Sequence, residues 1–487
     1  MRRGRAIPRE ITPRGASEST RRRVRDVGGA TPRHASGSLT VPLVTTPDST
    51  PSEPTPLEPP RHDPFAAMRE QNYRRFAFSF VASSLGLQML STAVMWEVYE
   101  RTDSAFMLGL TGLARALPVI ALTLPAGTLV DHGDRKRILS TTMVAFGGVA
   151  LAMAAASRWH APVWVLFALL VASGCVRSFN APSRGAILPS LLPASRFENA
   201  MAWQSGFFQF AAIAGPLLAG WILGMQVGTW IVYLLTALAC TAAGIAVLFL
   251  EPRPVARTGA PPRLRDMLAG AGHIWREKTI LGALTLDMLA VLFGGATALL
   301  PVFARDILGC GPMGLGALKA APYVGALGMA VWLAMRPSFT RAGPTLLWSV
   351  VAFGVSMIVF GLSTSFWLSL AALAVSGAVD NISVVIRHVL VQMRTPDQLR
   401  GRTTAVNSVF IECSNEVGAF ESGAVAAWLG PVWSVVTGGL GTIGVVAFVA
   451  LAFPALRRMR RLVDTPQDVF EAEVEESPHR RQGVEGV

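Results

Sequence analysis

Residues 227–250 read VGTWIVYLLTALACTAAGIAVLFL, a stretch of 24 residues without a charged side chain. A helix that crosses the hydrocarbon core of a bilayer needs about 20 consecutive apolar residues. In hydrocarbon, every backbone N–H and C=O must be paired within the protein, and an α-helix pairs them within the segment itself. The stretch therefore predicts a transmembrane helix.

The same kind of stretch recurs eleven more times between residues 75 and 455. The composition agrees, because 51% of the residues are hydrophobic and only 15% are charged, whereas a soluble domain carries about 25% charged residues. We therefore expect an all-α polytopic membrane protein with twelve transmembrane helices. The predicted helices are 75–98, 105–130, 138–157, 162–180, 200–223, 227–250, 279–303, 315–335, 343–363, 366–388, 403–427 and 431–455.

Basic residues are distributed unevenly between the two sets of loops that join these helices. One set contains Arg135, Lys136, Arg137, Arg184, Arg196, Arg253, Arg257, Arg263, Arg265, Arg276, Lys278, Arg336, Arg341, Arg394, Arg400, Arg402, Arg457, Arg458, Arg460 and Arg461. The other set contains Arg101, Arg158 and Arg305. Because loops rich in Lys and Arg stay in the cytoplasm, we expect both termini there and the chain in the inner membrane of a bacterium.

The charge pattern also divides the chain into segments. Residues 1–67 hold 11 Arg and 7 acidic residues among many Pro, Ser and Thr, which predicts a disordered, basic cytoplasmic tail. Residues 462–487 hold 2 Arg and 7 acidic residues, an acidic tail. Between them we expect two six-helix halves, 68–250 and 279–461. The linker 251–278 contains RLRDMLAGAGHIWREK, which predicts an amphipathic helix lying at the membrane interface.

The two halves repeat each other. At an offset of 203 residues several identities align without gaps, namely Arg184 with Arg387, Ser205 with Ser408, Phe207 with Phe410, Gly215 with Gly418 and Gly220 with Gly423. With one residue of slip, GLARALPV (112–119) aligns with GALKAAPY (316–323). Two pseudo-symmetric halves predict alternating access to a cavity near the middle of the membrane.

A loop motif connects the chain to a known family. The stretch GTLVDHGDRKR (127–137) resembles the GxxxD(R/K)xGR(R/K) signature of the major facilitator superfamily, with His132 and Asp134 departing from it. The motifs WEVYERT (96–102), FNAPSRGAILP (179–189), RGRTTAVNS (400–408) and SNEVGAFESG (414–423) resemble the branch that contains the enterobactin exporter. The resemblance spans about residues 68–461 and implies the twelve-helix facilitator fold and secondary transport.

Two motifs have roles that this resemblance implies. In the superfamily the loop signature forms a latch that stabilises the outward-facing state, and here it comprises Gly127, Asp131, Arg135, Lys136 and Arg137. We expect Gly127 to allow close packing and Asp131 to pair with a basic residue or to lie at a helix N-terminus; a solvated loop is the alternative.

The stretch GPLLAG (215–220) resembles the end of the helix-five motif of facilitator antiporters. Pro216 removes one backbone hydrogen bond, while Gly215 and Gly220 permit close helix approach. The motif favours export, and ordinary small-residue packing is the alternative.

Ionisable residues inside the spans are costly unless paired or hydrated, so each is a candidate site residue. Arg115 and Lys319 occupy equivalent positions, where they can attract an anionic substrate or hold the halves together through ion pairs. Arg177 and Asp380 are also equivalent and can form a gating salt bridge across the cytoplasmic side of the cavity, or each can pair within its own half. Arg387, seven residues after Asp380, shares its helix face but is about 10 Å away along the axis.

Proton coupling requires a carboxylate that changes its charge during transport. Asp287 ranks first because it lies inside the seventh helix, followed by Glu416 and Glu412. The two glutamates share a helix face at i and i+4, so their repulsion favours a proton on one of them. Capping or pairing at a helix interface is the alternative for both.

These observations predict a secondary transporter, and the leading prediction is a proton-coupled exporter of an amphipathic small molecule such as a siderophore or a drug. An importer of a small metabolite and a non-transporting sensor or scaffold are the alternatives. No phosphate loop, CxxC pair, metal-spaced histidine cluster or nucleophile–base motif occurs, so we expect neither an enzyme, a cofactor nor a bound metal. We expect small-molecule substrate, protons and lipid as partners, no nucleic acid, and a monomer.

Overall fold

The computed structural model describes residues 63–253, 272–336 and 341–459, although a few side chains within these ranges, including those of Asp131 and Glu412, are not described. The predicted acidic tail, nearly all of the predicted basic tail and most of the linker lie outside the described residues. Of the predicted amphipathic helix, the described residues 272–276 are helical.

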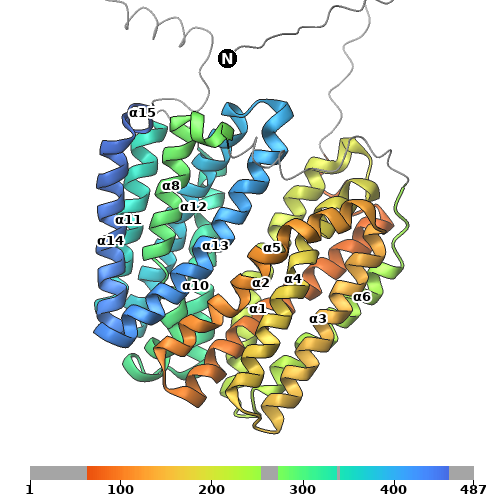
Figure 1. Cartoon of the computed structure of the whole chain (residues 1–487), viewed down its shortest axis with the longest axis horizontal. Helices are drawn as coiled ribbons and strands as arrows, with labels where there is room; N and C mark the ends of the chain where they lie inside the picture. The colour runs from red at the N-terminus through yellow and green to blue at the C-terminus, as the bar shows by residue number, and fades with distance from the viewer. Residues whose placement is uncertain (1–62, 254–271, 337–340, 460–487) are drawn as a thin grey trace, which may run out of the picture. The chain divides into compact units, whose positions relative to one another are not determined.

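Twelve long helices account for most of the described chain, one for each predicted apolar stretch (Figure 1). They are α1 (Gln71–Thr102), α2 (Ala105–His132), α3 (Arg135–Arg158), α4 (Val163–Leu191), α5 (Phe197–Gly224), α6 (Trp230–Leu248), α8 (Lys278–Phe293), α10 (Gly311–Ala334), α11 (Ala342–Leu362), α12 (Phe366–Arg394), α13 (Asp397–Leu429) and α14 (Pro431–Ala452). The predicted all-α membrane fold is thereby confirmed.

Eleven of these helices are long and apolar enough to cross a membrane; for α8 the span continues to Ile307. The twelfth, α13, has the length but is more polar, since Arg400, Glu416 and Glu421 lie within it. A charged side chain within a span must face protein or water rather than lipid. The polarity of α13 therefore indicates that the face carrying these residues points to protein or water and not to lipid.

The helices form two bundles, α1–α6 and α8–α14 (Figure 1). Each bundle has its own apolar core, which includes Tyr73 and Leu139 in the first and Leu286 and Leu346 in the second. Between the bundles, α2 packs against α13 and α5 packs against α10. Because α2 corresponds to α10 and α5 to α13 in the sequence repeat, these two contacts are related by the pseudo-symmetry that the repeat predicted.

Contacts between the bundles gather at one end of the molecule. We call the end at which α6 ends and α8 begins the linker end, and the end that carries residues 103–104 and 308–310 the distal end. In the distal half, a Cβ built on Gly109 would lie 3.0 Å from Gly423 Cα, and one built on Gly220 would lie 2.6 Å from the carbonyl oxygen of Pro312.

In the linker-end half of the same four helices, a Cβ at Gly127, Gly206, Gly328 or Gly401 would meet no described atom within 4 Å. The bundles are thus tightly packed at the distal end and not at the linker end. Gly127 accordingly has no close contact among the described atoms in this state, and the close packing expected of it stays a prediction.

Two predictions about individual helices were wrong. The seventh span, predicted as one helix over 279–303, is interrupted after Phe293 at Gly294 and Gly295, and the chain continues through short 3-10, α and π turns to Ile307. Paired glycines disfavour a continuous helix. The fourth span, predicted to end at residue 180, continues to Leu191, so Arg184 lies inside α4 and not in a loop.

Candidate functional site

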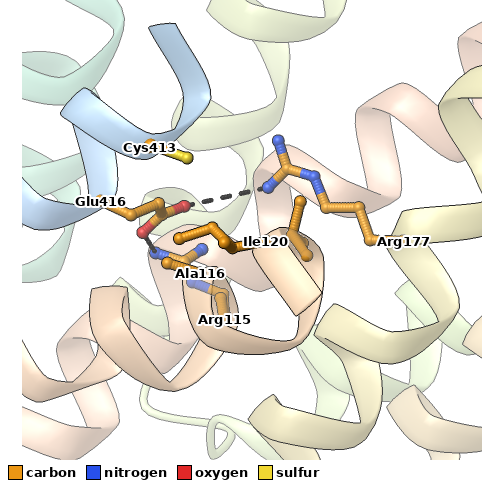
Figure 2. A pocket seen from close by; sticks show the side chains of 7 residues that line it. Arg115, Ala116, Ile120, Arg177, Cys413 and Glu416 are labelled. Carbon is orange, nitrogen blue, oxygen red and sulfur yellow. Dashed lines mark hydrogen bonds and ion pairs between the residues drawn. The ribbon is translucent and has the colours of Figure 1, made fainter. Parts of the chain in front are cut away.

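A pocket lies between the two bundles and is lined by residues of α2, α4 and α13 (Figure 2). Its charged members are Arg115 on α2, Arg177 on α4 and Glu416 on α13. Figure 2 shows both guanidinium groups directed at the carboxylate of Glu416. The remaining lining residues are Ala116, Val119, Ile120 and Cys413. A charged cluster with an apolar wall suits a ligand that has both an ionic group and an apolar body.

The carboxylate of Glu416 is shared between the two arginines. Its Oε2 is 3.5 Å from Nη2 of Arg115, and its Oε1 is 3.9 Å from Nη1 of Arg177. The side chains of Arg115 and Glu416 are 20% and 15% exposed, and that of Arg177 is 40% exposed. Since both arginines belong to the first bundle and Glu416 to the second, these ion pairs join the bundles.

Lys319 on α10, in the second bundle, contacts the first bundle across the same interface. Its Nζ donates a hydrogen bond of 2.8 Å to Oγ of Ser91 on α1 and lies 3.6 Å from Sδ of Met95. The structure therefore gives Arg115 and Lys319 partners in the opposite bundle. Attraction of an anionic substrate and attachment of the two halves both remain open as roles for them.

A second pocket lies within the second bundle, between α8, α11 and α12. It is lined by Asp287, Ala290, Val291, Ser349, Val350, Phe353, Asp380 and Ser383. Asp287 forms an ion pair with Arg387, and these two residues are only 7% and 3% exposed. The structure thus brings together three predicted residues, Asp287, Asp380 and Arg387.

Arg177 and Asp380, the proposed gate pair, line different pockets in this structure. Their pairing was expected in a state that is closed at the cytoplasmic side, so it remains a prediction. Glu412, the third proton candidate, lies in α13 four residues before Glu416.

Arg184 is a membrane-embedded residue that was misplaced by the sequence prediction. Its Nη2 donates to Oγ of Ser83 at 2.7 Å, and its guanidinium lies 5.0 Å from the centre of the Phe80 ring. Arg184 corresponds to Arg387 in the repeat, and with the one-residue slip Ser83 corresponds to Asp287. The sequence repeat could have revealed the position of Arg184, because it aligns Arg184 with Arg387, which was predicted to lie inside a helix.

A cluster of polar residues at the distal end was also not predicted. The Tyr99 hydroxyl donates to the Asp306 carboxylate, and Arg305 lies 2.6 Å from Oδ1 of Asp103 and 5.4 Å from the centre of the Tyr99 ring. Tyr99 and Asp103 belong to the first bundle, whereas Arg305 and Asp306 follow α8 in the second. The cluster therefore joins the bundles at the distal end.

The loop motif forms the start of α3. The Asp134 carboxylate accepts hydrogen bonds from the backbone N–H groups of Lys136 (3.0 Å) and Arg137 (3.2 Å), the usual arrangement of an N-cap. Arg135 donates to the carbonyl of Ala186 on α4 at 3.1 Å. Asp134, where the sequence departs from the superfamily signature, thus caps the N-terminus of α3. The latch role of Asp131 and its neighbours stays a prediction.

The helix-five motif lies where α5 is closely packed on both sides. A Cβ built on Gly215 would lie 3.2 Å from the carbonyl oxygen of Leu85 on α1, and Gly220 meets Pro312 and Gly316 of α10. Pro216 lies inside α5 without ending it. The two glycines therefore provide the close helix approach on which the motif interpretation depends.

Comparison with known proteins identifies the family. Residues 62–487 match the model of the transmembrane secretion effector family, which belongs to the major facilitator superfamily. The chain is 21% identical over 398 residues to macrolide efflux protein A of Streptococcus pyogenes, a match covering 79% of this chain and 95% of that protein. It is 24% identical over 391 residues to the enterobactin exporter EntS of Citrobacter koseri, covering 79% and 92%.

Solved structures share the fold at low sequence identity. A bacterial homologue of the human lysosomal transporter Spinster superposes with a TM-score of 0.63 at 14% identity, covering 83% of this chain and 100% of that one. The nucleoside transporter NupG superposes with a TM-score of 0.61 at 14% identity, covering 80% and 100%. With its two bundles and charged inter-bundle pocket, this chain belongs to the transmembrane secretion effector family of membrane transporters.

Proposed function

We propose that this transporter exports an amphipathic small molecule in exchange for protons, by alternating access to the pocket between the bundles. The observation that carries the proposal is the position of Arg115, Arg177 and Glu416 on helices of both bundles, around one pocket. A ligand bound there contacts both bundles, so its binding can favour one arrangement of the bundles over another.

The orientation of the transporter follows from its charged loops. The start of α3, with Arg135, Lys136 and Arg137, lies at the linker end, and the sequence places the basic linker between α6 and α8, so the positive-inside rule assigns that end to the cytoplasm. The bundles are packed together at the distal end, which would then close the pocket toward the outside. In this orientation the structure is inward-facing, a state in which an exporter receives its substrate and an importer releases it. The choice of export therefore rests on the efflux relatives.

The second pocket supports a separate proton site. A proton on Glu416 would release Arg115 and Arg177 for an anion, so proton and anionic substrate would bind together, as in a symporter. Protonation of Asp287 or Asp380 takes place in the other pocket and avoids this conflict. Asp287 therefore remains the first candidate for the residue that carries the proton.

The relatives support an amphipathic substrate. Their names describe efflux of macrolides and export of enterobactin, both larger than a simple metabolite. We therefore propose compounds of these kinds as the first to be tested.

The test uses everted membrane vesicles from cells that express the full chain, with a fluorescent amine reporting the acidic interior. Adding enterobactin or a macrolide should partly restore the reporter fluorescence, because an antiporter releases protons as it loads substrate. Radiolabelled substrate should accumulate in the same vesicles, and vesicles without the protein serve as the control. Uptake into right-side-out vesicles alone would instead show an importer. Accumulation without proton release would remove the proton coupling.

A further inference from the structure

Four of the side chains that line the pocket within the second bundle carry oxygen. They are Asp287 of α8, Ser349 of α11, and Asp380 and Ser383 of α12. The volume of this pocket is about 10 Å³, room for one water molecule or one ion of similar size. Carboxylate and hydroxyl oxygens are the ligands that hard metal cations prefer. The pocket thus has the chemistry and the size of a site for a single cation.

Asp380 is the residue of this pocket that most needs a ligand. It lies midway between Phe366 and Arg394, the two ends of the membrane-spanning helix α12. Its carboxylate forms no ion pair or hydrogen bond with any described residue, and Arg387 is paired with Asp287 instead. A carboxylate at this depth is costly unless a partner, an ion or water compensates its charge.

Ser383 provides independent evidence for a ligand. It is only 3% exposed and lies three residues after Asp380, on the same face of α12. Its hydroxyl lines the pocket and makes no hydrogen bond within the described part of the chain. Ser376, another buried serine of α12, instead donates to the carbonyl of Leu373 at 2.7 Å. Because a buried hydroxyl without a partner is costly, Ser383 is placed to contact whatever fills the pocket.

We propose that this pocket binds a Na⁺ ion, held between the Asp380 carboxylate and the Ser383 hydroxyl. A proton on Asp380 would remove the charge but would leave Ser383 without a partner and the pocket unfilled. Na⁺ supplies the opposite charge, binds the hydroxyl oxygen and has a suitable size. K⁺ is larger, so a pocket of this volume favours Na⁺.

Two further oxygens are available to the ion. Arg387 pairs with Oδ1 of Asp287 and leaves Oδ2, while Ser349 donates its proton to a backbone carbonyl at 2.8 Å and keeps its oxygen lone pairs. Asp287 and Asp380 are close enough to repel each other, and a cation between them relieves this repulsion. A carboxylate of α13 near this level, such as Glu412, would only add to the attraction of a cation.

The Na⁺ site goes beyond the proposed function, because binding of the ion requires neither transport nor a gradient. Within the transport cycle, Na⁺ would compete with protons for the second pocket. The second pocket would then respond to two ions, and the first pocket to the substrate.

Binding of radiolabelled Na⁺ to the purified full-length protein provides the test. Binding should saturate, and unlabelled NaCl should displace the label, whereas KCl or choline chloride at the same concentration should not. Na⁺ should also raise the melting temperature, because an ion that binds the folded protein alone stabilises it.

Variants separate the site from general damage to the protein. Asp380→Asn should lower the affinity for Na⁺ by at least about tenfold, because it removes the charged ligand. It also removes an uncompensated charge, so without Na⁺ it should melt no lower than the unmodified protein. Ser383→Ala should weaken binding by about three- to tenfold. The matched control is Ser376→Ala, whose hydroxyl lies outside the pocket; its affinity for Na⁺ should not change.

The inference is overturned if Na⁺ binding does not saturate, if K⁺ displaces Na⁺ equally well, or if Asp380→Asn or Ser383→Ala binds Na⁺ as tightly as the unmodified protein. Saturable Na⁺ binding without proton release in the vesicle assay would keep the Na⁺ site and remove the proton coupling. Proton release without Na⁺ binding would keep the proposed function and remove the Na⁺ site.

Discussion

At the scale of single residues, the feature that most constrains the mechanism is the buried Asp287–Arg387 pair. An ion pair with both partners almost fully buried stabilises a fold little by itself, but loss of one partner leaves an uncompensated charge. Its counterpart in the first bundle is the contact between Arg184 and Ser83, which lacks a carboxylate. The two halves therefore differ in the chemistry that proton transfer needs.

We expect Asp287→Asn to destabilise the purified protein by about 3–5 kcal/mol, because Arg387 remains charged and buried. The double variant Asp287→Asn, Arg387→Gln should recover much of this loss, since neither charge remains. Thermal unfolding of the two purified variants measures the difference. Equal or greater destabilisation in the double variant would contradict the buried-pair argument.

The double variant also separates stability from coupling. If Asp287 carries the proton, the folded double variant should fail to release protons in the everted-vesicle assay. Full proton-driven transport by Asp287→Asn would rule out Asp287 as the coupling residue.

At the scale of helices, most of the fold could be predicted from the sequence, because an apolar run long enough to cross a bilayer has few other stable arrangements. Each of the twelve predicted stretches contains a long helix. The break at Gly294 was missed, since the glycines lie within a run that is apolar throughout. The end of α4 could not be predicted because an arginine such as Arg184 is more typical of a loop than of a membrane-spanning helix.

The partners of the charged residues could not be predicted in this way. Arg115 and Glu416 are 301 positions apart in the chain, and only the packing of α2 against α13 brings them together. The repeat related Arg115 to Lys319 and Arg184 to Arg387, but it carried no information about which helix each of them would contact.

The α5–α10 contact provides a prediction at this scale. Gly220→Ala should destabilise the protein by about 1–3 kcal/mol, because the added methyl group meets backbone atoms of Pro312 and Gly316 that cannot rotate away. The matched control is Gly148→Ala on α3, where a Cβ meets no described atom within 4 Å. Thermal unfolding of the purified variants should show a loss for the first and little change for the second. Equal behaviour would mean that the α5–α10 contact is not tight in solution.

At the scale of the whole molecule, the two bundles are joined at the distal end by layers of different kinds. Tyr99–Asp306 and Arg305–Asp103 form the outermost layer, and the Phe106 and Phe420 rings meet edge to face with centroids 5.9 Å apart. Gly109 against Gly423 and the Glu416 ion pairs follow toward the middle. Alternating access requires that all of these contacts separate in each transport cycle.

Locking this end should therefore stop transport. In a background in which Cys175, Cys240, Cys310 and Cys413 are replaced by alanine, Phe106→Cys with Phe420→Cys should react with a short bis-thiosulfonate linker and lose transport. A reducing agent should restore it, because the linker is held by disulfides. The control pair Trp164→Cys with Phe167→Cys has similar ring spacing, 5.8 Å, but lies within α4. Linking it joins no two bundles and should leave transport intact. Undiminished transport by the cross-linked inter-bundle pair would mean that the distal end need not open, and that a substrate leaves this protein by another path.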